Sequence, residues 1–198
     1  IHQYGSFTLI TCQVFPMFKR TGKFLSLFLI TASFLPIVDA KISLSKGDDV
    51  VLVGAGMGSR MIHYGHFETE VYLNHANLNL KIRNLCDEGN TPGFRPHPSR
   101  NQEEQYAFPG AKELIHESLQ AATKPKGHFP TPDQWLSDLH AEVVLCFFGF
   151  NSSFDGPRQA DRFKKELDAY IKHLNSMPFG QSTPQIALIS PTAVESVP

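Results

Sequence analysis

The stretch DDVVLVGAGMGSRMIHYGHFE, Asp48 to Glu68, decides how the fold is read. Its apolar run from Val50 to Val53 has the length and the β-branched content of a buried strand. The glycines that follow predict a tight turn, and the residues from about Met57 to Asn74 predict a helix. A strand that passes through a glycine turn into a helix is typical of α/β domains, in which ligands bind beyond the carboxyl ends of the strands.

The same alternation of strand and helix continues along the chain. Leu78 to Leu85 alternates apolar and polar residues, and Glu142 to Phe148 is a continuous apolar run, as in central parallel strands. Apolar residues at helical spacing from Phe163 to Leu174 predict a helix that stops at Pro178, and Ile186 to Ile189 follows as a fourth strand. We therefore predict an α/β fold, a three-layer α/β/α domain with a flavodoxin-like parallel sheet.

A long connection separates the second and third predicted strands. It runs from Cys86 to about Thr131 and contains the proline-rich segments NTPGFRPHPSR and GHFPTPDQW. We interpret it as irregular, with one helix from Gly110 to Ala122.

The composition of the chain limits which classes of protein it can belong to. The chain has 198 residues, of which 41% are hydrophobic and 19% charged, and this suits one globular domain with a buried core. The formal net charge of -1 gives no overall attraction to polyanions. We therefore expect no nucleic acid partner.

The N-terminal region has the pattern of a secretory signal peptide. From Met17 a basic start leads into an apolar run from Phe24 to Val38 and a small-x-small end at Ala40. The alternative is a membrane anchor, but a run of about 15 residues is short for a bilayer. We expect residues 1–16 to be an upstream extension, 17–40 a signal peptide, and 41–198 a secreted or periplasmic domain that is not held at the membrane.

The opening turn has two readings from its own residues. Gly54, Gly56 and Ser59 give G-x-G-x-x-S, which approaches a dinucleotide fingerprint but lacks its third glycine. Asp87 or Glu88 would supply the acidic residue, yet a secreted protein meets little NAD, so we expect no cofactor. The other reading is a glycine turn that serves packing alone.

The ends of the other strands suggest a family. Asn84 and Gly89 follow the second strand, and Gly149 and Asn151 form a G-x-N after the third. From about Asp49 to Val194 the chain resembles the SGNH hydrolases, also called the GDSL esterase and lipase family. It is most similar to a secreted planctomycete-type branch that is sometimes joined to c-type cytochrome modules. The chain contains no C-x-x-C-H, so we expect no attached haem, while association with a c-type cytochrome protein stays open.

The resemblance implies ester hydrolysis and assigns residues to it. In the family a serine attacks the ester, a histidine accepts its proton, and donors from the serine, glycine and asparagine blocks hold the oxyanion. Gly89 and Asn151 match the glycine and asparagine positions. Alternatively, Gly89 serves a turn, and Asn151 caps a helix or belongs to an N-x-S glycosylation sequon.

The catalytic serine and histidine are not found where the family has them. Gly-Asp-Ser aligns with Gly54, Ala55 and Gly56, so Gly56 leaves the nucleophile position vacant. Ser59, about one helical turn on, is the substitute nucleophile, or else an ordinary residue at the helix start. The D-x-x-H block would follow a fifth strand, and the sequence stops before it, so we expect the domain to be incomplete at its C-terminus.

Three histidines are candidate substitutes for the missing base. His63 and His66 form an i, i+3 pair that could bind a metal, or they are surface residues of a helix. His97, close to Arg95, could contact an anionic ligand, or it belongs to a solvated loop. No third metal ligand at a recognisable spacing accompanies the pair, so we expect no metal site.

The functional expectation has two classes. The first is an SGNH-type domain that acts on an ester, such as an O-acetyl group on a carbohydrate, and that is inactive as this chain. The second is a non-catalytic module that binds a small ester or carbohydrate, or a scaffold domain of a larger secreted redox protein.

The resemblance also bears on two cysteines, Cys86 and Cys146. The family's strand order, 2-1-3-4, places strand one between the strands that carry them, which separates them by about 9–10 Å. A disulfide needs Cα atoms within about 7 Å, so we predict two free thiols.

Overall fold

The computed structural model describes residues 41–116, 119 and 129–192. The predicted signal peptide and upstream extension lie outside the described residues. Within the described part no helix is both long enough and apolar enough to cross a membrane.

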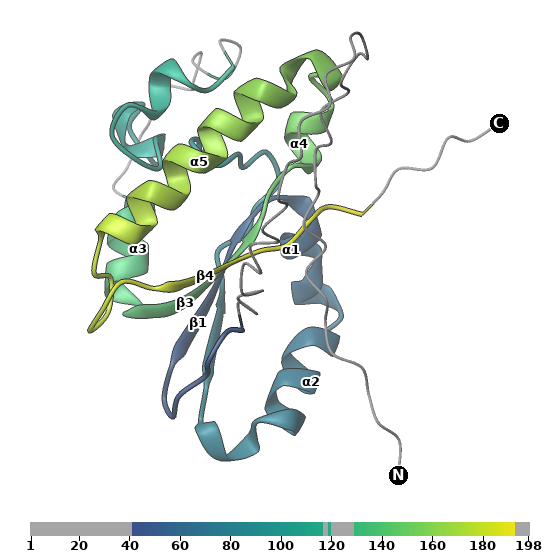
Figure 1. The fold of residues 1–198 in the computed structure, drawn as a ribbon, viewed down its shortest axis with the longest axis vertical. Coiled ribbons are helices and arrows are strands. Elements are labelled where there is room, and N and C mark those ends of the chain that lie inside the picture. Colours follow the sequence, from purple (N-terminus) through teal and green to yellow (C-terminus); the bar gives the residue numbers. More distant parts are fainter. Residues whose placement is uncertain (1–40, 117–118, 120–128, 193–198) are drawn as a thin grey trace, which may run out of the picture. The chain divides into compact units, whose positions relative to one another are not determined.

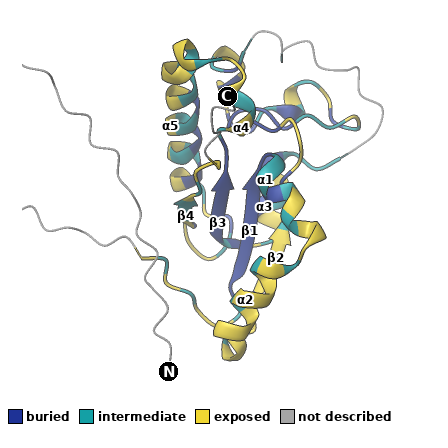
Figure 2. Ribbon diagram, turned by 90° about the vertical axis from the view of Figure 1, so that its right-hand side faces the viewer, coloured by how far each residue is buried: buried dark blue, intermediate teal, exposed yellow. Residues whose placement is uncertain are grey.

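Four parallel strands form the sheet, in the order β2-β1-β3-β4. Figure 1 labels β1, β3 and β4, and Figure 2 also shows β2 beside β1. This order and the α/β class confirm the fold predicted from the sequence. The strand expected from Leu78 is shorter at its start, because Ala76–Leu78 forms a 3-10 turn and Asn79 has a positive φ of 48°. The strands are β1 (Asp49–Gly54), β2 (Lys81–Asn84), β3 (Ala141–Phe147) and β4 (Gln185–Leu188).

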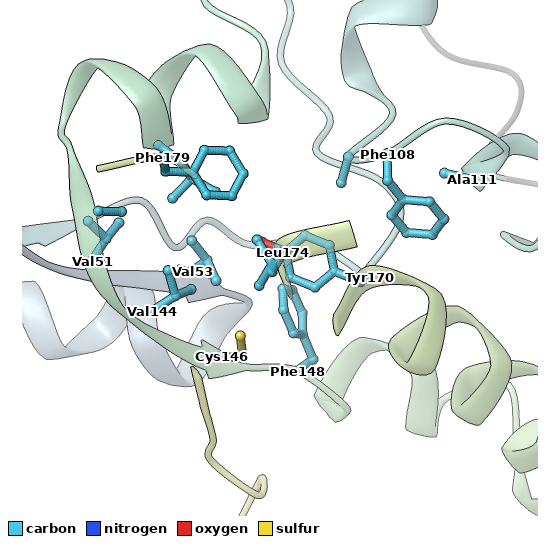
Figure 3. Close-up of a cluster of buried hydrophobic side chains, with 13 residues drawn as sticks. Val51, Val53, Phe108, Ala111, Val144, Cys146, Phe148, Tyr170, Leu174 and Phe179 are labelled. Atoms are coloured by element: carbon cyan, nitrogen blue, oxygen red, sulfur yellow. The ribbon is translucent and has the colours of Figure 1, made fainter. Parts of the chain in front are cut away.

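Two hydrophobic clusters, one on each face of the sheet, make the three layers. Val51 and Val53 of β1 point into a cluster that includes Leu136, Tyr170 and Leu174 (Figure 3). These residues come from α3 (Pro132–Asp138) and α5 (Ala160–Ser176). Val50 and Leu52 point the other way, into a cluster against which Met57 and Phe67 pack. That second face is covered by α1 (Gly56–Arg60) and α2 (His66–Asn74), and α4 (Phe150–Ser153) follows β3.

The helix predicted from Met57 to Asn74 is interrupted. After α1 the chain makes a 3-10 turn at Met61–His63, and Gly65 then adopts a left-handed conformation with φ of 60°. Residues with positive φ do not fit a right-handed helix, so α2 begins anew at His66. Most of α2 is exposed, whereas the central strands are buried (Figure 2). The prediction of one continuous helix was therefore wrong.

Helix α3 was missed, although its sequence carries a start signal. The Thr131 hydroxyl accepts a hydrogen bond from the Gln134 backbone N–H at 3.2 Å, and the Gln134 side chain accepts one from the Thr131 N–H at 2.8 Å. This is a capping box, and Pro132 occupies the first helical position. The residues TPDQ lie in a proline-rich segment that the sequence analysis interpreted as irregular, so the capping box was not recognised as a helix start.

The long connection after β2 is irregular, as predicted, but its described part is packed rather than loose. Phe94 and Tyr106 form an antiparallel bridge, and the Ala107 N–H donates to the Gly93 carbonyl at 2.9 Å. Short 3-10 turns lie within the connection at Glu103–Gln105 and Ala111–Glu113. Another 3-10 turn, at Pro157–Gln159, lies between α4 and α5. In place of the helix predicted from Gly110 to Ala122, the described residues have a 3-10 turn at Ala111–Glu113 and 3-10 conformation at Leu119, and part of the range lies outside them.

Both thiols are free, as predicted. Cys146 belongs to the cluster beneath α3 and α5, while Cys86 belongs to the cluster on the opposite face of the sheet. Burial raises the pKa of each thiol to about 12, so both stay protonated at neutral pH.

A buried carboxylate on α5 fastens the connection to the domain. Glu166 is only 4% exposed, and its Oε1 accepts hydrogen bonds from the Thr91 hydroxyl at 2.5 Å and the Gly93 N–H at 2.7 Å. Burial raises the pKa of Glu166, although these hydrogen bonds and the charges of Arg95 and Arg162 oppose the shift. Burial therefore makes this carboxyl group bind its proton more tightly in the folded state than in the unfolded state.

Substitution of Glu166 tests this anchor. We expect Glu166→Ala to lower the free energy of unfolding by about 1–3 kcal/mol, because two buried donors lose their acceptor.

Glu166→Gln keeps an acceptor and mimics the protonated acid. Because the folded-state pKa is raised, the wild type should match Glu166→Gln below about pH 4.3 and lose stability relative to it as the pH rises through the folded-state pKa. Urea unfolding across this pH range provides the measurement, and a Gln variant that weakens relative to wild type at higher pH would contradict the assignment.

Candidate functional site

The turn after β1 begins with a glycine that packing requires. Gly54 has φ of 142°, and a Cβ placed on it would lie 2.3 Å from the Phe147 carbonyl oxygen of β3. The next residue, Ala55, donates its N–H to that same oxygen at 2.8 Å. Gly54 thus allows β1 to stay against β3 while the chain turns away from the sheet.

Gly58 has a packing role as well. A Cβ there would lie 2.3 Å from the Cys86 Sγ, so only glycine lets α1 approach the chain that follows β2. The Asn84 amide donates to the Gly58 carbonyl at 2.8 Å and strengthens this contact. Packing therefore explains two of the three glycines without a bound phosphate.

Gly56 differs from both of its neighbours. Its φ is not positive, and a Cβ built on it would meet nothing closer than the Glu88 Cγ at 4.0 Å. Gly56 opens onto a cleft of about 300 Å³, which we call the turn cleft. The residues that line it are Gly56, Met57, Arg60, Glu88, Phe150, Asn151 and Thr192. The position where the resemblance expects a serine is thus open to solvent and faces the cleft.

Asn151 reaches this cleft from the end of β3. The N-cap of α4 is Gly149, with φ of 115°, and Asn151 is the second residue of the helix, so it is not the cap. Its Nδ2 donates to the Asn90 carbonyl at 3.0 Å. A side-chain amide has two N–H groups, so one remains for a ligand in the cleft.

Asn90 joins the strand ends and was not singled out from the sequence. It is 4% exposed, and its own Nδ2 donates to the Gly54 carbonyl at 3.0 Å. Through its amide it holds the turn after β1, and through its carbonyl it holds Asn151. An asparagine directly after the glycine turn D-E-G was the available signal, because asparagine amides often satisfy nearby backbone groups.

Gly89 lies beside Asn90 but does not line the turn cleft. Its φ is 89°, which supports the interpretation that glycine serves the turn, where the Asn90 N–H donates to the Asp87 carbonyl at 3.3 Å. Gly89 and Asn151 line a neighbouring cavity of about 230 Å³ together with Thr91 and Glu166. Asn151 therefore lines the turn cleft together with Gly56 and the neighbouring cavity together with Gly89. That all three residues converge on one oxyanion stays a prediction.

Ser59 is engaged locally. Its hydroxyl donates to the Gly56 carbonyl at 3.1 Å, within the first turn of α1, and Ser59 is not among the described residues that line the turn cleft. This geometry is that of an ordinary helix residue.

The two early histidines do not form a helical pair. His63 ends a 3-10 turn and His66 begins α2, with the left-handed Gly65 between them. Both are exposed, and the His66 ring stacks near Tyr64 with centroids 6.4 Å apart. The described residues contain no group of three or more side chains suited to hold a metal ion.

His97 is not a residue of a solvated loop. It is half-buried, and its ring stacks on Phe129 with centroids 3.6 Å apart. Burial and the charge of Arg100 lower the pKa of His97, against the opposing charge of Asp87. His97 and Arg95 line a cavity separate from the turn cleft.

Two serine substitutions within one turn test whether position 56 is open. Gly54→Ser should destabilise the protein by about 3 kcal/mol or more, because its side chain would meet the β3 backbone. Gly56→Ser should change the free energy of unfolding by no more than about 0.5 kcal/mol. Urea unfolding followed by circular dichroism compares the two, and equal damage from both would show that the turn has no free space at Gly56.

Comparisons of the chain with protein-family models, curated proteins and solved structures gave no significant match. The fold and the site therefore rest on the residues and geometry described above.

Proposed function

We propose that this domain is an SGNH-type binding domain that holds a small ester or carbohydrate ligand in the turn cleft without hydrolysing it. The observation that carries the proposal is the open, side-chain-free position of Gly56 beside the Asn151 amide. The cleft lies at the carboxyl ends of β1 and β3, which is where parallel α/β sheets bind ligands.

The cleft offers recognition groups suited to an acyl oxygen. The remaining N–H of Asn151 can donate to a carbonyl, and the fixed bond to Asn90 keeps this amide oriented before a ligand arrives. Phe150, which is 40% exposed, provides an apolar surface next to it. A preoriented donor beside an apolar surface favours a neutral ester or acetylated sugar.

The same lining argues against acyl transfer. Hydrolysis through a covalent intermediate needs a nucleophile with an adjacent base. No histidine and no serine line the cleft in the described part of the chain. The Ser59 hydroxyl donates its hydrogen bond to the Gly56 carbonyl. Thr192 and Glu88 also line the cleft, but no hydrogen bond joins this hydroxyl to this carboxylate among the described residues, so the nucleophile-base pair that the hydrolase alternative needs is not formed there.

Binding and turnover can be measured with one probe, p-nitrophenyl acetate. We expect no release of p-nitrophenol above buffer and heat-denatured controls. In saturation-transfer NMR the acetyl methyl group should receive magnetisation from the wild-type protein. Gly56→Leu should abolish that transfer, because its side chain fills the cleft at a position where the fold has room.

Ser59→Ala is the matched control, since it changes the same turn without changing the cleft lining. It should bind the probe as the wild type does. Turnover that disappears in Ser59→Ala would overturn the proposal in favour of a hydrolase, and transfer that persists in Gly56→Leu would place the ligand elsewhere.

A further inference from the structure

A further cavity contains two buried cations that form no salt bridge within the described part of the chain. This arginine cavity, of about 190 Å³, lies between the ends of β1 and β2, the long connection, and helices α3 and α5. Asn90 lines it, but no residue of the turn cleft does. The side chains that decide its chemistry are Arg95, His97, Arg100, Phe129, Trp135 and Tyr170.

Both guanidinium groups are almost fully removed from solvent. Arg95 is 5% exposed and Arg100 is 3% exposed. Arg100 is held by the backbone, since its Nε donates to the Pro130 carbonyl at 2.7 Å and its Nη1 to the Arg95 carbonyl at 3.0 Å. Arg95 is less satisfied: Nη1 reaches the Phe94 carbonyl only at 3.4 Å, and the buried Nη2 has no acceptor among the described residues.

No salt bridge balances these charges in the described part of the chain. Asp87 is the only carboxylate that lines the cavity, but it is exposed and accepts the Glu88 N–H at 2.8 Å. Glu166, which lies within the electrostatic reach of Arg95, is already engaged by Thr91 and Gly93. A buried cation without a paired anion costs several kcal/mol in general.

Aromatic rings replace only part of the lost hydration. The Arg95 guanidinium lies 4.5 Å from the Phe148 ring centroid and 5.1 Å from that of Tyr170. Arg100 lies 5.1 Å and 5.2 Å from the centroids of Phe129 and Trp135. A ring face gives a guanidinium no hydrogen-bond acceptor, and of these rings only that of Tyr170 carries one, a hydroxyl that hydrogen-bonds the Arg95 side chain. The arrangement therefore leaves room for an oxyanion.

We propose that the arginine cavity binds the carboxylate of a small molecule whose body is apolar and planar. A carboxylate matches the planar fork of a guanidinium with two parallel hydrogen bonds, and Arg95 lines the cavity with a guanidinium that forms no salt bridge in the described part of the chain. Val53, Leu85 and Leu136 give the cavity apolar wall, Trp135 adds an aromatic side chain, and Asn84 and Asn90 are the neutral polar residues of the lining. This lining suits a ligand with one charged group better than a fully hydrated inorganic anion.

Benzoate is the simplest probe of this chemistry, and benzamide is its neutral isostere. Trp135 is the single tryptophan of the chain and lines the cavity, so its fluorescence reports on occupancy. We expect saturable quenching by benzoate and at least about ten-fold weaker binding of benzamide, because the amide brings no charge to the guanidinium pair. This comparison needs only the wild-type protein.

Arg95→Met removes the charge and keeps an apolar side chain, while Arg158→Met makes the same change at an exposed arginine outside the cavity. Arg95→Met should weaken benzoate binding at least about ten-fold and leave the stability of the ligand-free protein equal or higher, because it removes an unpaired buried charge. A purely structural arginine would instead lose stability on substitution. Arg158→Met should bind as the wild type does.

Three outcomes would overturn the proposal. They are the absence of saturable quenching, equal binding of benzoate and benzamide, and displacement of benzoate by an equal concentration of inorganic phosphate or sulfate. The last would assign the cavity to inorganic oxyanions. The readout does not involve the turn cleft, so the binding of p-nitrophenyl acetate and the binding of benzoate can succeed or fail independently.

Discussion

The two hydrogen bonds of Asn90 are the constraint on which the functional edge of this domain depends. Its side chain donates to the Gly54 carbonyl and its carbonyl accepts from the Asn151 amide, each at 3.0 Å. Three segments that leave three strands are thereby tied to one buried residue. Because Asn90 is buried, breaking either the bond of its side-chain amide or the bond of its backbone carbonyl would leave a polar group without a water partner, and this makes the link rigid. Asn90 itself lines the arginine cavity, and its carbonyl holds Asn151, which lines the turn cleft.

The long connection, to which Asn90 belongs, is also anchored to the helices. Glu166 of α5 fixes it at Thr91 and Gly93, and the two arginines that follow are inserted against aromatic rings of α3, α5 and the end of β3. The segment therefore carries buried polar groups that a simple loop would expose. Polar groups in such positions require partners, and their placement at the carboxyl ends of the strands is consistent with a role in binding rather than in folding alone.

The sequence predicted the strands well, because the runs in β1 and β3 are continuously apolar. The strand order was implied by the family resemblance and did not follow from the apolar runs. The sequence predicted too long a helix after β1, since periodicity does not reveal that Gly65 has a positive φ. It missed α3, whose capping box lay in a proline-rich segment. Asn90 and Arg100 were not assigned, and Arg95 was noted only as the neighbour of His97, a candidate contact for an anionic ligand. The roles of these residues depend on backbone carbonyls and rings that are brought near only by the path of the connection. Residues near strand ends were predictable as a group, but their individual contacts were not.

The central claim is that Asn151 is held against Asn90 at the edge of the turn cleft, and NMR of the side-chain amides tests it most directly. In 15N-labelled protein the Asn151 amide protons should show nuclear Overhauser contacts to Asn90 and to Gly56. They should also exchange with solvent more slowly than those of Asn79, which is exposed. Contacts confined to α4, together with exchange as fast as that of Asn79, would contradict the account, because the strand ends would then not form one preoriented site.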